Sequence, residues 1–185
     1  TTPMHMRHDA GWVAGEITSY VRRLVNEIGG NQVGTVGKID LVPNLVNVVA
    51  SKATLTVDLR NTDDEILKDA ELQLANFCDN LSTQEEVKLH REVLARFEPV
   101  TFDDALVGDV IRFSELLDIS VKQMTSGAGH DAQMFARVCP AVMIFVPSEN
   151  GLSHNPDEFT SQKEIEDGSN VLLQMMAELS GLHYD

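Results

Sequence analysis

Residues 53–60 alternate strictly between apolar and polar side chains, and this pattern constrains the fold more than any other feature of the sequence. A two-residue period is the geometry of a β-strand with one face against a core and the other toward water. The alternation therefore predicts a strand whose inner face needs an apolar layer packed on it. The inward positions are Ala53, Leu55, Val57 and Leu59, and the outward ones are Thr54, Thr56, Asp58 and Arg60.

Amphipathic helices are predicted on both sides of this strand. Residues 10–28 repeat apolar side chains at helical spacing, and Gly29 and Gly30 provide a left-handed stop. Thr62 followed by Glu65 has the pattern of a capping box, which predicts that a second helix begins there. The apolar face of this second helix consists of Ile66, Ala70, Leu74 and Phe77.

Two further strands are predicted in the first part of the chain, at residues 32–41 and 87–97. The order is then helix, strand, strand, helix, strand. With one more strand before residue 1, this order would give a ferredoxin-like α+β sandwich, an antiparallel sheet with two helices on one face. Without that strand, the sheet would have an edge open to pairing with another chain.

The character of the sequence changes at Glu98 and Pro99, where we predict a boundary between domains of residues 1–98 and 99–185. The second part is of the α/β type, because residues 141–146 form a continuous apolar run, typical of a strand buried on both faces of a parallel sheet. Its predicted elements are helices at 103–117, 131–136 and 162–180 and strands at 120–123 and 141–146.

Charge and cysteine usage narrow the classes of function. The net charge of −15 repels phosphate backbones and anionic membranes, so we expect no nucleic acid and no membrane as partner. Cys78 and Cys139 lie far apart, and we interpret them as reduced thiols of a cytoplasmic protein. The sequence opens with Thr1 rather than methionine, which we interpret as the boundary of a fragment.

One candidate for chemistry is the polar loop at residues 147–160, which contains His154. This loop follows the carboxyl end of the predicted buried strand, where open α/β sheets bind ligands. A loop histidine can turn a ring nitrogen toward a metal or a substrate. It can equally face water, and one histidine does not make a metal site.

A second candidate is the glycine turn at residues 126–131. Gly127 and Gly129 permit close approach of the backbone to an anion, and His130 could do acid–base or orienting work. An ordinary strand–helix turn with Asp131 as N-cap explains the same residues. Spacing alone does not separate the two interpretations.

Two polar residues of the first part are candidate substrate ligands. Arg60 ends the alternating strand on the same face as Asp58, and its guanidinium could hold a carboxylate with two hydrogen bonds. A surface ion pair with Asp58 is the competing interpretation. Asn47 lies where a loop meets a strand, and its amide could bind a carboxylate or carbamoyl oxygen, although asparagine is common in turns.

The sequence resembles the amidase, hydantoinase and carbamoylase family, which includes N-carbamoyl-L-amino acid hydrolases, allantoate amidohydrolases and β-ureidopropionases. The resemblance covers nearly the whole chain with its motifs in order. The motifs are TTPM at 1–4, VGTVG at 33–37, PN at 43–44, NVV at 47–49, VDLR at 57–60, SGAGHDAQ at 126–133, MIFVPS at 143–148 and GLSHNP at 151–156.

The resemblance implies a ferredoxin-like dimerisation lid followed by the C-terminal part of a zinc-peptidase-like α/β catalytic domain. It implies hydrolysis of the non-peptide C–N bond of a small carboxylated ureido acid by a homodimer joined through the lid. The intact enzyme would hold two zinc ions, or manganese or cobalt in their place. The implied roles are metal binding for His154, catalysis and substrate binding for His130, and substrate binding for Asn47, Arg60, Gly127 and Gly129.

The sequence also departs from the family pattern. The family's HxD segment, its pair of glutamates and its middle zinc-binding histidine have no counterpart in these 185 residues. We therefore predict that this polypeptide alone binds zinc weakly at best and turns nothing over. Two other interpretations stay open, a dimerisation or binding module and an aminoacylase or exopeptidase of the same clan. The motif at 126–133 argues against the second of these.

Overall fold

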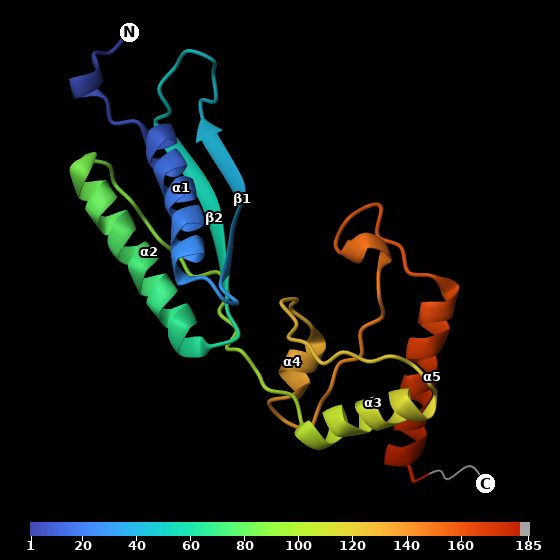
Figure 1. Cartoon of the computed structure of the whole chain (residues 1–185). Helices are drawn as coiled ribbons and strands as arrows, with labels where there is room; N and C mark the ends of the chain where they lie inside the picture. Colours follow the sequence, from blue (N-terminus) through green and yellow to red (C-terminus); the bar gives the residue numbers. More distant parts are fainter. Residues whose placement is uncertain (182–185) are drawn as a thin grey trace. The chain divides into compact units, whose positions relative to one another are not determined.

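The computed structural model describes residues 1–181 and divides into two compact units, with the second beginning at Val100 (Figure 1). This boundary lies one residue beyond the predicted position. Unit 1 contains η1 (Met4–Met6), α1 (Ala10–Ile28), β1 (Val33–Val42), β2 (Lys52–Arg60) and α2 (Asp64–Gln84). Unit 2 contains α3 (Asp104–Leu116), α4 (Asp131–Phe135), η2 (Glu149–Gly151) and α5 (Gln162–Leu179).

Helix α1 forms where the sequence predicts it. The carboxylate of Asp9 accepts hydrogen bonds from the backbone N–H groups of Gly11 at 2.9 Å and Trp12 at 3.1 Å. These bonds satisfy donors that a helix start leaves open. Gly29 ends the helix in the left-handed region, at φ 67°. The buried side chains of α1 lie on one stripe and are Val13, Ala14, Ile17, Val21 and Leu24.

Strands β1 and β2 form an antiparallel hairpin. Its register runs from Val33 opposite Arg60 at one end to Val42 opposite Lys52 at the other. The two strands make up the whole sheet among the residues that the structure describes. The antiparallel sheet of the predicted fold is therefore present in part, as one hairpin.

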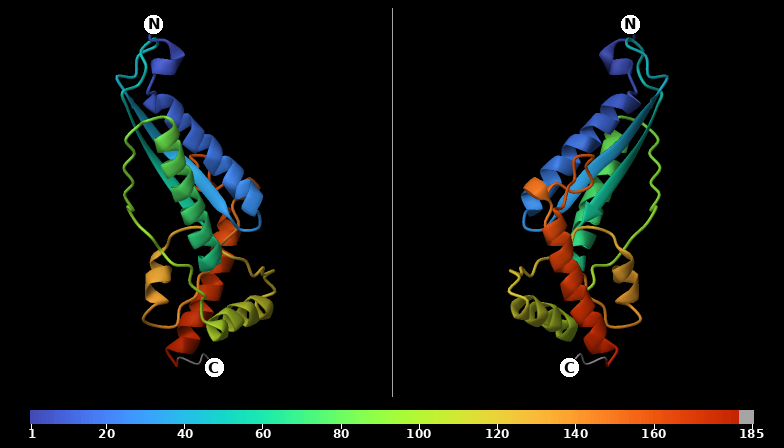
Figure 2. Two further views of the ribbon diagram at one scale, coloured as in Figure 1. Left: turned by 90° about the vertical axis from the view of Figure 1, so that its left-hand side faces the viewer. Right: turned by 90° about the vertical axis from the view of Figure 1, so that its right-hand side faces the viewer.

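The core of unit 1 lies between this hairpin and the two helices, which cover the same face of it (Figure 2). The rings of Tyr20 in α1 and Phe77 in α2 stack with centroids 3.9 Å apart. Leu55, Val57 and Leu59 face this core, as their alternation predicts. The enclosed side chains of the core all come from the helices: Val13, Ile17, Val21, Cys78 and Leu81.

The start of α2 differs from the prediction, because Thr62 and Glu65 form no capping box. Asp63 is the N-cap, and its carboxylate accepts the N–H groups of Glu65 at 2.9 Å and Ile66 at 3.1 Å. The Thr62 hydroxyl instead accepts a hydrogen bond from the Asn31 side chain at 2.9 Å. The carboxylate of Asp63, one residue after Thr62, therefore caps α2, and Thr62 instead bonds to the turn that follows α1.

Residues 87–97, predicted as a strand, pair with no other strand in the structure. No backbone–backbone hydrogen bond joins residues 88–97 to any other residue among 1–181. The prediction is therefore wrong for the described chain, because a strand exists only beside a neighbour that accepts and donates its backbone bonds. The side chains of Val87 and Leu89 nevertheless pack on the helix core.

Unit 2 is built around the packing of α3 against α5. Asp103 caps α3 by accepting the N–H of Leu106 at 3.0 Å. Ser161 and Glu164 form a reciprocal capping box at the start of α5. Both helices lie where the sequence predicts them. The buried side chains between them are Val110 and Phe113 of α3 and Val171 and Met175 of α5.

The two strands predicted for unit 2, at 120–123 and 141–146, are not formed among the described residues. Val142 and Ile144 pack on the α3–α5 core, whereas Phe145 is 55% exposed. An apolar run of this kind is typical of a strand with strands beside it and a layer on each face. The described part of unit 2 supplies one such layer and no neighbouring strand, so the segment stays outside a sheet.

The two cysteines lie in different units, and both thiols are free. Cys78 is buried in the unit 1 core, and this burial raises the pKa of its thiol. Cys139 is exposed. Among residues 1–181, no helix combines the length and the apolar character that crossing a membrane requires.

Candidate active site

Arg60 at the end of β2 is held by Asp58, two residues earlier. Nε of Arg60 lies 3.0 and 3.1 Å from the two carboxylate oxygens of Asp58, and Nη2 lies 2.6 Å from Oδ2. These hydrogen bonds lower the pKa of Asp58 and raise that of the guanidinium. Both side chains are half-exposed. The surface ion pair is therefore present, and it orients a guanidinium whose five N–H donors can serve more than one carboxylate.

Asn47 lies in the loop that joins β1 to β2, and its side chain is exposed. The register puts this loop at the Val42–Lys52 end of the hairpin and Arg60 at the other end (Figure 1). Strand β2 spans roughly 26 Å at about 3.3 Å per residue. One copy of unit 1 therefore does not present Asn47 and Arg60 to the same small carboxylate, as the two predicted roles together would require.

His130 is the N-cap of α4, a place that the ordinary-turn interpretation gave to Asp131. Its Nδ1 atom accepts a hydrogen bond from the backbone N–H of Ala132 at 3.0 Å. Asp131 is the first helical residue, where a carboxylate is favourable next to the helix start. The imidazole itself reaches the N–H group that a cap must satisfy, so the ordinary turn with Asp131 as N-cap, one of the two interpretations left open, is not the one formed.

This hydrogen bond decides which nitrogen of His130 carries a proton. A ring nitrogen that accepts an N–H is unprotonated, so the neutral imidazole holds its proton on Nε2. The side chain of His130 is exposed. In this tautomer Nε2 donates hydrogen bonds and does not bind a metal or accept a proton.

Gly127 and Gly129 have open space around them. Neither has a positive φ, and a Cβ atom built on either would meet no described atom within 4 Å. The backbone and the packing of the described residues therefore do not require glycine at these two positions. Their predicted role, close approach of the main chain to a substrate, stays a prediction.

Two neighbours hold the exposed loop residue His154. Its backbone lies in the left-handed region at φ 55°, and its N–H donates to Oε2 of Glu158 at 2.7 Å. Its Nδ1 atom lies 3.1 Å from the Ser153 hydroxyl. Ser153 and Glu158 were not singled out by the sequence analysis. The sequence feature that could have pointed to these two residues is their spacing. A hydroxyl residue directly precedes the histidine, and a carboxylate follows it by four residues.

The described residues do not complete a metal site around His154. No group of three or more His, Cys, Asp or Glu side chains within residues 1–181 is placed to hold a metal ion. A zinc site needs three or four protein ligands, so His154 fits a metal only as one ligand among others. Its geometry suits that role, because an Nδ1–H donating to Ser153 would leave Nε2 for the metal.

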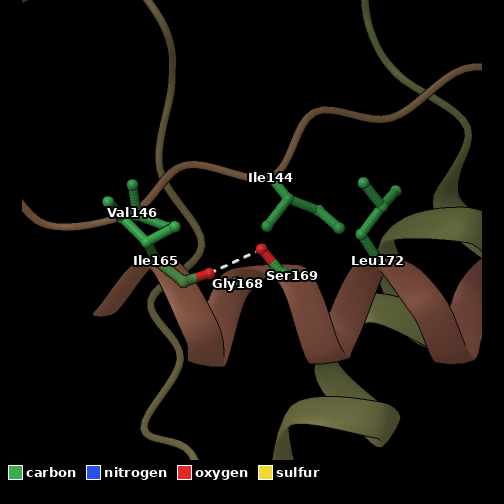
Figure 3. Close-up of a pocket in the computed structure, with 6 residues that line it drawn as sticks. All are labelled: Ile144, Val146, Ile165, Gly168, Ser169 and Leu172. Carbon is green, nitrogen blue, oxygen red and sulfur yellow. Dashed lines mark hydrogen bonds between the residues drawn. The ribbon is translucent and has the colours of Figure 1, made fainter. Parts of the chain in front are cut away.

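None of these residues lines a shallow pocket that unit 2 contains. It has a volume of about 190 Å³ and lies between residues 144–146 and α5 (Figure 3). Gly168 permits this approach, because a Cβ atom there would collide with Val146. The pocket contains no acid, base or metal-binding side chain, and we assign it no chemistry. Its lining is Ile144, Val146, Ile165, Gly168, Ser169 and Leu172.

Solved structures that share this architecture include amidases of the hydantoinase/carbamoylase family. The chain matches a hydantoinase/carbamoylase family amidase from Burkholderia vietnamiensis with a TM-score of 0.92 and 33% identity, over 96% of this chain and 43% of that one. It matches the crystal structure of AtUAH in complex with glyoxylate with a TM-score of 0.93 and 31% identity, over 97% and 43%. The chain thus shares its fold with part of solved amidases of this family.

The chain belongs to peptidase family M20/M25/M40, whose family model matches residues 5–178. It is 36% identical to the allantoate amidohydrolase of Escherichia coli (strain K12), over 97% of this chain and 44% of the relative. It is 33% identical to the N-carbamoyl-L-amino-acid amidohydrolase of Paenarthrobacter aurescens, over 97% and 43%. It is also 33% identical to the ureidoglycolate hydrolase of Arabidopsis thaliana, over 96% and 38%.

The chain spans less than half the length of these curated relatives. Two of these relatives are named as amidohydrolases and the third as a hydrolase.

Proposed function

We propose that this chain forms part of a metal-dependent amidohydrolase that cleaves the non-peptide C–N bond of N-carbamoyl-L-amino acids or of related ureido acids such as allantoate. The observation that carries the proposal is the match of 97% of the chain to relatives named for this chemistry. The geometry of the polar side chains in both units supports it, because each could serve a carboxylated ureido substrate.

Two charged or polar groups would contact the substrate directly. Arg60, oriented by Asp58, would bind the substrate carboxylate with paired hydrogen bonds. His130 would donate its Nε2–H to the carbamoyl oxygen, where negative charge develops as the C–N bond is attacked. Gly127 and Gly129, with open space around their Cα atoms, would let the substrate lie close to the main chain.

The metal of the proposed enzyme is zinc, as two ions, with manganese or cobalt as alternatives that accept the same ligand types. His154 would contribute one ligand through Nε2, and other parts of the enzyme would contribute the rest. The lack of a three-residue ligand cluster among residues 1–181 supports our further proposal that this chain alone binds zinc weakly and is inactive. We derive no catalytic step through the metal.

Homodimer formation through unit 1 is the final part of the proposal. Asn47 and Arg60 lie at opposite ends of the hairpin, so one copy does not bring both to one substrate. In a two-fold symmetric dimer, Arg60 of one copy and Asn47 of the other could serve the same site. We therefore assign these two residues of a single copy to different sites of the dimer.

A substrate panel tests the reaction. The full-length enzyme that carries this chain is incubated with allantoate, N-carbamoyl-L-amino acids, N-acetyl-L-amino acids and dipeptides. We expect ammonia from the ureido acids and no cleavage of the other two classes. Cleavage of the acetylated amino acids or dipeptides alone would favour an aminoacylase or exopeptidase. A folded, metal-loaded dimer that cleaves nothing would favour a dimerisation or binding module.

A further inference from the structure

The loop of residues 149–159, which carries the candidate metal ligand, is closed by hydrogen bonds within itself. At its base, the backbone N–H of Glu149 donates to the carbonyl oxygen of Phe159 at 2.7 Å. Near its tip, the backbone N–H of Glu158 donates to the carbonyl oxygen of Asn155 at 2.9 Å. Both bonds join residues of the loop to each other, so the segment supports its own turn.

His154 occupies a backbone conformation that an L-residue adopts only with support. Its φ of 55° lies in the left-handed region, where the Cβ atom crowds the carbonyl oxygen that follows it. A non-glycine residue stays in this region only when surrounding contacts hold it there. The residue that holds this backbone therefore also limits the positions that the imidazole can reach.

Glu158 provides this support. Its Oε2 atom accepts the backbone N–H of His154 at 2.7 Å, a short hydrogen bond that the negative charge of the carboxylate strengthens. Both side chains are exposed, so the bond contributes little to the packing of unit 2. Its main effect is therefore on the conformation of the loop at the histidine.

Ser153 holds the imidazole itself. Its hydroxyl oxygen lies 3.1 Å from Nδ1 of His154. A metal bound at Nε2 leaves the ring proton on Nδ1, and this N–H then needs an acceptor. The hydroxyl of Ser153 is in place to accept it. One neighbour thus holds the backbone of His154, and the other holds its ring.

We propose that Glu158 and Ser153 are positioning residues for His154, and that Glu158 acts by accepting the backbone N–H rather than by binding the metal. The inference rests on the proposed function, in which His154 is one of the metal ligands. A ligand that is already held in its binding conformation loses less conformational freedom when the metal binds. Loss of either contact should therefore weaken metal binding without unfolding unit 2.

The zinc affinity of the full-length enzyme tests the role of Glu158. It is measured by competition with a chromogenic chelator, and the urea unfolding of each metal-free variant should stay unchanged. Glu158→Ala should weaken zinc binding roughly tenfold to a hundredfold, the range for residues that orient a metal ligand. Glu158→Gln keeps an oxygen that accepts the N–H, so it should weaken binding by less than about threefold.

Asp157 provides matched controls of the same charge, because its carboxylate makes no hydrogen bond or ion pair with any residue among 1–181. Asp157→Ala and Asp157→Asn therefore show what the loss of one negative charge in this loop does to zinc binding. Equal affinities of Glu158→Ala and Asp157→Ala would overturn the proposal. A Glu158→Gln variant as weak as Glu158→Ala would overturn it too, because the charge would then matter and the hydrogen bond would not.

His154→Ala, titrated with zinc alongside, separates this inference from the proposed function. We expect it to weaken zinc binding at least as much as Glu158→Ala. If His154→Ala weakens binding and Glu158→Ala does not, the positioning role alone falls. If His154→Ala leaves the affinity unchanged, the metal-binding role of His154 falls and the inference falls with it.

NMR of the metal-free 185-residue chain tests the contact without any metal. A hydrogen bond to a carboxylate shifts an amide proton downfield, so the His154 amide should move upfield in Glu158→Ala. It should stay nearly in place in Glu158→Gln and Asp157→Ala. An unchanged His154 amide in Glu158→Ala would overturn the proposal.

A pair of substitutions tests the ring contact of Ser153. Ser153→Ala removes the hydroxyl and should weaken zinc binding of the full-length enzyme roughly tenfold. Ser153→Thr keeps a hydroxyl and should stay within about threefold of the unsubstituted enzyme. Equal zinc affinities of the two variants would overturn the role of Ser153.

Discussion

Asn47 and Arg60 lie at opposite ends of the β1–β2 hairpin, separated by the full length of the antiparallel ladder. Both residues were predicted to bind the substrate. Their separation, roughly 26 Å along β2, exceeds what two side chains of one copy can bridge around a small molecule. We propose that the two residues of one copy serve different sites of a dimer.

Mixed dimers test this assignment. Arg60→Ala and Asn47→Ala, each in the full-length enzyme, should lower kcat/KM, with a loss of roughly 2–4 kcal/mol of transition-state stabilisation for Arg60. When the two inactive proteins are mixed and allowed to exchange subunits, half of the dimers are mixed. One site of each mixed dimer then has both residues intact, so about a quarter of the activity should return. No recovery, with subunit exchange verified by mass spectrometry, would place both residues in the site of their own copy.

His130 should act as a hydrogen-bond donor in addition to capping α4. His130→Asn keeps a cap residue and His130→Ala removes it, so the alanine variant alone should lose about 1 kcal/mol of unfolding free energy. Both variants remove the Nε2–H donor, so both should lower kcat/KM of the full-length enzyme roughly 10²-fold. Steady-state kinetics and urea unfolding of the same two variants separate the effects. Full activity in His130→Asn would limit this residue to its capping role.

The Asp58–Arg60 pair should show in an acid titration of the 185-residue chain. Arg60 lowers the pKa of Asp58, so in the folded state this carboxyl should titrate below about 3.9, the ordinary aspartate value. The pair then stabilises the fold above that pH, and its contribution is lost as the pH falls through the folded pKa. Because both side chains are half-exposed, the contribution should be at most about 1 kcal/mol. Carboxyl NMR should show the midpoint rise in Arg60→Gln, and an unchanged midpoint would contradict the pairing.

Gly34 should be required by the packing of α1 on the hairpin. A Cβ atom at this position would lie 2.7 Å from Cγ1 of Val25 and 2.9 Å from Cδ2 of Leu59. Gly34→Ala should therefore cost about 1–3 kcal/mol of unfolding free energy in chemical denaturation. Gly15→Ala, on an open face of α1, is the matched control and should stabilise by about 0.5–1 kcal/mol. Equal stabilities of the two variants would show that α1 lies farther from the hairpin than the structure has it.

The sequence predicts the helices well because their signals are local. The apolar stripe that contains Val13 and Val21, and the capping pair of Ser161 and Glu164, are complete within single segments. The start of α2 was missed by one residue because a long-range partner, Asn31, engages Thr62. A capping pattern alone does not reveal that contact.

The strands were predicted less well, because a strand depends on its neighbours. Residues 53–60 pair with β1, which is close in sequence, and the prediction is confirmed. Residues 87–97 and 141–146 have equally apolar patterns, but no described strand pairs with either. Val87, Leu89, Val142 and Ile144 still pack on the cores. Val93 is 80% exposed and Phe145 is 55% exposed, so the burial of these segments was predictable only in part.

The sequence was enough to predict which residues form the candidate site. It was not enough to predict how all of them are placed. The histidines at 130 and 154 stood out by their turns, but the tautomer of His130 depends on the backbone N–H of Ala132. The separation of Asn47 from Arg60 follows from the register of the hairpin, which neither residue reveals alone.

The most direct test of the central claim is metal content and ammonia release measured together on the full-length enzyme and its His154→Ala variant. The account predicts that the unsubstituted enzyme binds metal and releases ammonia from allantoate or an N-carbamoyl-L-amino acid. The variant should bind less metal and lose turnover, while the urea unfolding of its metal-free form stays nearly unchanged because the His154 side chain is exposed. Undiminished metal and turnover in the variant would contradict the account by removing His154 from the site.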